Sequence, residues 1–74
     1  MTLMEELSGA RMVQHDSMRG FVLAWFGGQG IHAYDDDGRE ISYWMLGGHE
    51  NDADPEDVRA DMAEEIESGD YLER

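Results

Sequence analysis

Asp37 and Gly38 stand between two short apolar runs, and this dipeptide limits the possible folds of the chain more than any other feature. Before it lies IHAYD (31–35) and after it REISYWML (39–46), both rich in aromatic and β-branched residues. An Asp-Gly pair between such runs is a strong signal for a β-hairpin, because Gly adopts the positive φ of tight turns without strain. The pattern therefore predicts two antiparallel strands joined at residues 36–38.

Further strands precede this hairpin. FVLAWF (21–26) is bounded by Gly20 and by GGQG (27–30), as a short strand between turns would be. RMVQHDSM (11–18) is the candidate for one more strand. Residues 11–46 are therefore expected to form an antiparallel β-meander of three or four strands.

Two helices are expected outside the meander. Thr2 followed by Glu5 fits a capping box, so residues 1–9 form either a short helix or a flexible N-terminus. Asp54 is a good N-cap and Gly69 a good stop, which predicts a helix over 55–68 after an acidic linker at 47–54. With 74 residues the chain suits a single α+β domain, 1–74, with the C-terminal helix packed on the sheet.

Strand alternation divides the meander into two faces. A first face is expected to hold Phe21, Leu23, Trp25, Ile31, Ala33, Ile41, Tyr43 and Met45. A second is expected to hold Val22, Ala24, Phe26, His32, Tyr34, Ser42, Trp44 and Leu46. Both faces are largely apolar, and one long helix covers only one of them. The second face therefore needs the N-terminal segment, another subunit or a partner.

The charge of the chain is strongly negative. Eighteen acidic residues face five basic ones for a net charge of −13, and no lysine is present. Residues 1–49 carry seven acidic residues and three arginines, whereas residues 50–74 carry eleven and two. Such a chain is repelled by nucleic acid and by anionic membranes and is attracted to basic protein surfaces. A GC-rich genome or a halophilic host would also produce an acidic, lysine-poor composition, but neither predicts clustering on one element.

The expected C-terminal helix carries this charge on one side. A helical wheel places Val58, Met62, Ala63 and Ile66 on the buried half. The candidate partner-binding residues occupy the opposite half: Glu56, Asp57, Asp61, Glu64, Glu65 and Glu67. Like charges four residues apart destabilise a helix slightly, whereas an ordinary solvated face mixes signs. The pattern is therefore either a solvated face or a surface for a basic partner.

Aromatic residues suggest a secondary interface. Phe26, Tyr34 and Trp44 are expected together on the second sheet face. They are either core residues or, if that face is open, an apolar patch for a partner or a homodimer.

No pattern indicates catalysis or a cofactor. Without cysteine, disulfides and thiolate metal ligands are excluded. In YDDDGRE, alignment with a calcium-binding EF-hand loop places Ala33 and Trp44 where acidic ligands belong. The three histidines lack metal-ligand spacing, and the glycine-rich segments lack phosphate-loop motifs. We therefore expect no enzyme, no metal and no cofactor.

These observations predict a non-enzymatic inhibitor that imitates nucleic-acid phosphates and blocks the basic groove of a nucleic-acid-handling protein. Small acidic phage proteins of the anti-CRISPR and anti-restriction type act in this way, and the likeness lies in size and charge. No run approaches the roughly 20 apolar residues of a membrane span, so a cytoplasmic protein is expected, in the host cell if it is phage-encoded. The alternative is a small structural or adaptor domain that dimerises or binds through an apolar sheet face, with its acidity serving solubility or reflecting a halophilic host.

Overall fold

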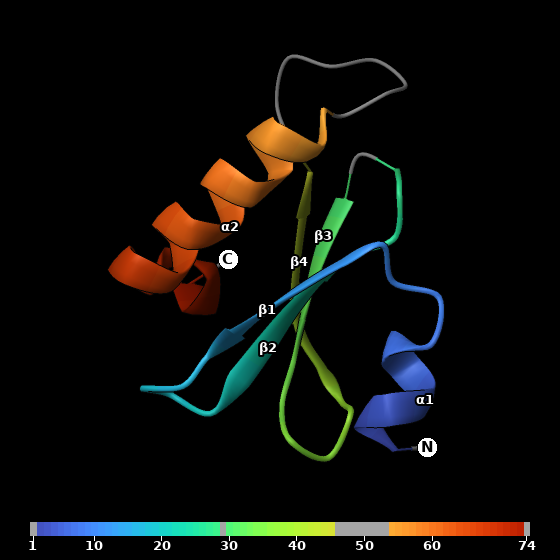
Figure 1. Ribbon diagram of the computed structural model, residues 1–74. Coiled ribbons are helices and arrows are strands. Elements are labelled where there is room, and N and C mark those ends of the chain that lie inside the picture. The colour runs from blue at the N-terminus through green and yellow to red at the C-terminus, as the bar shows by residue number, and fades with distance from the viewer. Residues whose placement is uncertain (1, 29, 46–53, 74) are drawn as a thin grey trace.

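The computed structural model describes residues 2–28, 30–45 and 54–73, and it confirms the expected α+β fold (Figure 1). The elements in chain order are α1 (Leu3–Leu7), β1 (Met12–Asp16), β2 (Phe21–Trp25), β3 (Gly30–Tyr34), β4 (Glu40–Met45), α2 (Pro55–Ser68) and the 3₁₀ helix η1 (Asp70–Glu73). Of the expected linker at 47–54, only Asp54 lies within the described residues.

The four strands form one sheet in the order β1-β2-β3-β4, and each pair is antiparallel. The turn between β3 and β4 is built as its sequence predicts. Oδ1 of Asp35 accepts hydrogen bonds from the backbone N–H groups of Asp37, at 3.0 Å, and Arg39, at 2.9 Å. Gly38 takes the left-handed conformation, with φ +87°. RMVQHDSM supplies the first strand, so the meander has four strands rather than three.

The pairing of β3 with β4 corrects the expected assignment of side chains in β4. Ala33 pairs with Ser42, but Tyr34 pairs with Glu40, so Ile41 is an extra residue in a β-bulge. One extra residue reverses the orientation of every side chain beyond it. Trp44 and Ser42 therefore share a face with Ile31 and Ala33, whereas Tyr43 and Met45 lie on the opposite face. Leu46 lies outside the described residues.

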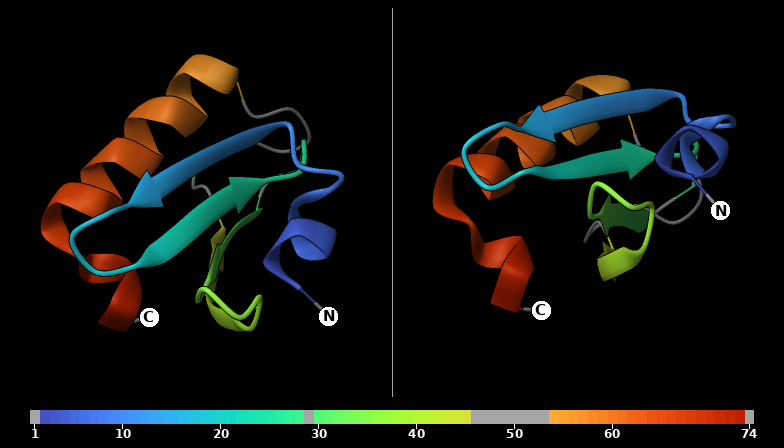
Figure 2. Two further views of the ribbon diagram at one scale, coloured as in Figure 1. Left: turned by 60° about the horizontal axis from the view of Figure 1, so that its bottom comes forward. Right: turned by 90° about the horizontal axis from the view of Figure 1, so that it is seen from below.

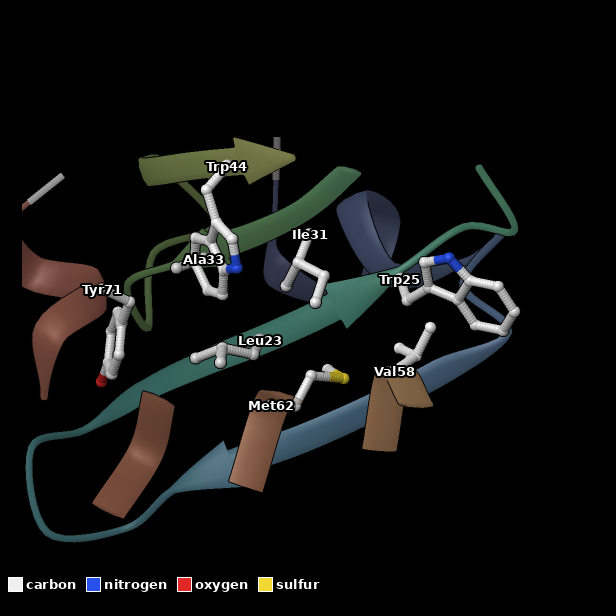
Figure 3. Close-up of a cluster of buried hydrophobic side chains, with 8 residues drawn as sticks. All are labelled: Leu23, Trp25, Ile31, Ala33, Trp44, Val58, Met62 and Tyr71. Atoms are coloured by element: carbon white, nitrogen blue, oxygen red, sulfur yellow. The ribbon is translucent and has the colours of Figure 1, made fainter. Parts of the chain in front are cut away.

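Helix α2 and η1 cover the face that carries Trp44. The buried apolar core consists of Leu23, Trp25, Ile31, Ala33, Trp44, Val58, Met62 and Tyr71 (Figure 3). Helix α2 begins at the Asp54 cap, whose side chain accepts a hydrogen bond from Glu56 N, and ends at Gly69 with φ +77°. These caps explain why the observed bounds are the expected ones. None of the described helices is long and apolar enough to cross a bilayer.

The other face of the sheet lies toward α1, on the side away from α2 (Figure 2). The N-terminal segment contacts the β3–β4 turn, where a Cβ at Gly38 would come within 2.8 Å of the Leu3 backbone nitrogen, and it approaches the second face at Phe26, whose ring would lie 3.9 Å from a Cβ at Gly9. Val22, Ala24 and Tyr34 are buried on this face. The N-terminal segment thus supplies part of the cover that the second apolar face needs.

Candidate protein-binding surfaces

Helix α2 buries a different stripe from the one expected. Val58 and Met62 are in the core as predicted, but Glu65 is buried with them, at 6% exposed, and Ala63 is exposed. The buried stripe is therefore rotated toward the acidic half of the helix. The expectation that Glu65 belongs to the solvent-facing acidic surface is corrected, because its side chain is directed into the protein.

Asp61 is also engaged within the domain. It is half-buried, and its Oδ2 accepts a hydrogen bond of 3.1 Å from the indole Nε1 of Trp44. This bond satisfies the polar group of a buried tryptophan. Asp61 therefore serves the core at the boundary of the acidic surface.

The remaining acidic residues of the helix form its outward side. Glu56, Asp57, Glu64 and Glu67 are all exposed. Among the described residues, the ion pairs that arginines form are those of Arg19 with Asp16 and of Arg39 with Asp37, so none involves Glu56, Glu64 or Glu67. We call these four residues the α2 acidic surface. It is narrower than expected, and its charge is predominantly negative, since Arg59 is the exposed cation within the same helix.

The end of α2 is held by a cluster that sequence reasoning missed. Asp16, at the end of β1, is 1% exposed, and its carboxylate binds Arg19 at 2.7 Å. Nη1 of Arg19 also donates a hydrogen bond of 2.7 Å to the Ile66 carbonyl. Burial raises the pKa of Asp16, but hydrogen bonds from Tyr71 and Arg19 outweigh burial and leave this pKa below its ordinary value. The cluster therefore holds the C-terminal end of α2 in place.

The three aromatic residues expected to form a secondary interface are not together. Phe26 and Tyr34 lie on the second sheet face, where both rings contact His32, but Trp44 points into the core on the other face. Burial, followed by the charges of Glu40 and Glu6, raises the pKa of Tyr34. Trp44 is therefore unavailable to a partner that approaches the second face.

Tyr43 occupies the place on the second face that Trp44 was expected to take. Its ring centroid lies 4.6 Å from that of His32, and Nδ1 of His32 forms a hydrogen bond with the Glu40 carboxylate. Tyr43 is 50% exposed and Met45, next to it on the same face, is 54% exposed. The signal that would have identified Tyr43 is the bulge at Ile41, which sequence alternation does not reveal.

The aspartates of the β3–β4 turn come close together, since Asp35, Asp36 and Asp37 each have a carboxylate oxygen within 4.8 Å of the others. Asp35 is already engaged by the two backbone N–H groups of the turn. Asp35 therefore has the structural role in the turn that the sequence predicts for this segment.

No protein-family model matches the chain, and neither a curated protein nor a solved structure matches it significantly.

Proposed function

We propose that the protein is a non-enzymatic inhibitor that binds a basic surface of a nucleic-acid-handling protein through the α2 acidic surface. The observation that carries the proposal is the excess of exposed negative charge along one helix, where Glu56, Asp57, Glu64 and Glu67 outnumber a single exposed cation, Arg59. These residues extend along about 16 Å of helix at a mean spacing of about 5.5 Å, which is of the same order as the ~3.4 Å per phosphate of one DNA strand. A groove that binds a phosphate backbone therefore suits this surface.

The orientation of α2 reduces the number of acidic residues that are available to a partner from the six expected to four. Glu65 and Asp61 serve the core, so the binding energy has to come from the four exposed residues. A surface of this kind accelerates association by electrostatic steering and loses affinity as salt is added. We place the protein in the cytoplasm, in the anti-CRISPR or anti-restriction class, with a phage as its source.

The test uses charge reversal at the two exposed residues farthest from the helix start. Glu64→Lys with Glu67→Lys removes the negative charge without disturbing the N-terminal turn, where acids favour the helix dipole. The matched control is Glu5→Lys with Asp36→Lys, because both residues are exposed and lie outside α2. Each pair changes the net charge equally.

The protein is immobilised and exposed to lysate at low salt, and the captured proteins are eluted with duplex DNA. We expect DNA to displace them, the Glu64/Glu67 variant to lose capture by about tenfold, and the control pair to retain it. Capture that duplex DNA leaves unchanged, or that survives the Glu64/Glu67 reversal, contradicts the mimicry.

The half-exposed Tyr43 and Met45 favour a second candidate, an adaptor domain that dimerises through the second sheet face. Its acidity would then serve solubility. Sedimentation equilibrium of the wild type and of Tyr43→Ser with Met45→Ser tests this candidate. A dimer that the substitutions convert to a monomer supports it, and a monomeric wild type excludes it.

A further inference from the structure

The ring of Tyr43 is held in place although half of the residue is open to solvent. Its hydroxyl donates a hydrogen bond of 2.9 Å to Sδ of Met45, and its ring packs against His32. Beneath the ring lies Gly30 of β3, where a Cβ would collide with the aromatic carbons. Glycine thus allows the ring to rest on bare backbone. An exposed aromatic ring that is already ordered loses little entropy on binding, which favours its use as a contact residue.

Negative charge lies beside this ring. The Glu40 carboxylate is bonded to Nδ1 of His32, and the His32 ring contacts Tyr43, so carboxylate and phenol flank the same imidazole. Both groups are on the second sheet face, because Glu40 pairs with Tyr34 and Tyr43 with His32. Glu40 and Tyr43 are both exposed. An aromatic face with a carboxylate nearby attracts a cation through the ring quadrupole and the ionic charge together.

We propose that Tyr43 and Glu40 form an arginine-binding subsite for the basic partner. The existence of that partner rests on the proposed function, and the subsite names one of its contacts. A guanidinium group fits better than an ammonium group, because its plane stacks on the phenol while its N–H groups reach a carboxylate. The net charge of −13 favours a cationic segment over a second copy of this chain.

The subsite and the α2 acidic surface lie on different faces of the sheet, so each can be altered while the other stays intact. The probes are labelled oligo-arginine and oligo-lysine peptides of equal length. Affinities are measured by fluorescence anisotropy, and contacts by NMR of the Tyr43 ring protons. Tyr43→Leu removes the aromatic face and keeps an apolar side chain, whereas Tyr43→Phe keeps the face. Urea unfolding of each variant checks that the fold is retained.

We expect the arginine peptide to bind more tightly than the lysine peptide and to shift the Tyr43 ring resonances. Tyr43→Leu should weaken binding of the arginine peptide by about threefold and binding of the lysine peptide by less, and thereby reduce the selectivity for arginine. Tyr43→Phe should bind the arginine peptide as tightly as the wild type does, and Glu40→Gln should bind it more weakly. Glu64→Lys with Glu67→Lys should weaken both peptides alike.

Equal losses for both peptides in Tyr43→Leu, or unshifted Tyr43 resonances, overturn the subsite. So do Tyr43 resonances that shift with protein concentration alone, because a second copy would then occupy this face. Neither result bears on the lysate capture through Glu64 and Glu67, so the two proposals fail separately.

Discussion

The hydroxyl of Tyr71 donates a hydrogen bond of 2.5 Å to Oδ2 of Asp16, although 55 positions separate the two residues. Asp16 ends β1 and Tyr71 belongs to η1, so this bond joins the first hairpin to the last described element. Both residues are buried. With Arg19, which bridges Asp16 to the Ile66 carbonyl, the pair fixes the position of α2 on the sheet.

Removal of the Tyr71 hydroxyl should destabilise the domain without emptying the core. We expect Tyr71→Phe to lower the free energy of unfolding by about 2 kcal/mol, because a buried hydrogen bond to a charged group is lost. Tyr43→Phe is the control, since Tyr43 is half exposed and, among the described residues, its hydroxyl donates to the Met45 thioether. Urea unfolding followed by circular dichroism measures both variants. Equal effects would show that the Tyr71–Asp16 bond adds nothing.

The same pair should make stability depend on pH at both extremes. The pKa of Asp16 is below its ordinary value of 3.8, so its contribution is present above about pH 4 and is lost as pH falls through the lowered pKa. Burial and the bond to Asp16 raise the pKa of Tyr71 above 10.0, so its contribution is lost as pH rises above that value. Asp16→Asn should flatten the acid limb of a plot of unfolding free energy against pH. If the acid limb were unchanged in Asp16→Asn, the loss of stability at low pH would come from other carboxylates.

Much of this fold follows from local chemistry. The Asp54 cap and Gly69 define α2, Thr2 caps α1, and the Asp35–Gly38 turn closes the last hairpin. The sides of β4 could not be predicted, because they depend on whether Ile41 is accommodated as a bulge, and the tertiary contacts of the strand decide that. The Asp16–Arg19–Tyr71 cluster was equally inaccessible, since its members acquire meaning only when distant segments meet.

The orientation of α2 predicts opposite results for two adjacent glutamates. Glu65→Lys should destabilise the domain by about 2 kcal/mol or more, because it places a longer, cationic side chain at a buried position. Glu64→Lys should change the free energy of unfolding by less than about 0.5 kcal/mol. Thermal unfolding of both variants provides the comparison. Similar values would indicate that Glu65 faces solvent as sequence periodicity suggested.

The bulge at Ile41 predicts a similar contrast within β4. Trp44→Ala should cost about 3–5 kcal/mol, because it empties a core position and leaves Asp61 without its indole donor. Tyr43→Ala should cost about 1 kcal/mol, because this ring is half exposed. Denaturant unfolding distinguishes the two faces. If Tyr43→Ala cost more than Trp44→Ala, Tyr43 would be the core residue and β4 would alternate regularly, without a bulge at Ile41.

Gly20 and Gly38 have the same backbone conformation, so a comparison of their alanine variants separates the cost of backbone strain from the cost of a steric clash. Gly20 and Gly38 have φ values of +83° and +87°, so alanine strains both turns by about 1 kcal/mol. A Cβ at Gly38 also meets the backbone of Thr2 and Leu3, whereas at Gly20 it meets nothing within 4 Å. Gly38→Ala should therefore cost more and detach α1, which hydrogen exchange of α1 amides would report. Equal costs and unchanged exchange would show that α1 does not dock on this turn.

For the candidate surfaces, composition and the helical wheel identified the acidic side of α2 but placed its boundary wrongly. Hydrophobicity predicted that Ala63 is buried and Glu65 exposed. Which side of the helix is buried depends instead on the orientation of α2 on the sheet, and this orientation covers Glu65. Four of the six expected binding residues remain exposed.

The dependence of Asp16 on Tyr71 also sets an order of events during synthesis. When β1 leaves the ribosome, Arg19 follows within three residues, but Tyr71 of η1, the other partner of the Asp16 carboxylate, has yet to be translated. Val58 and Met62, which close the core over Leu23 and Ile31, are also made late. The meander therefore emerges with one apolar face open, and this domain acquires its native packing only after residue 71 has been added.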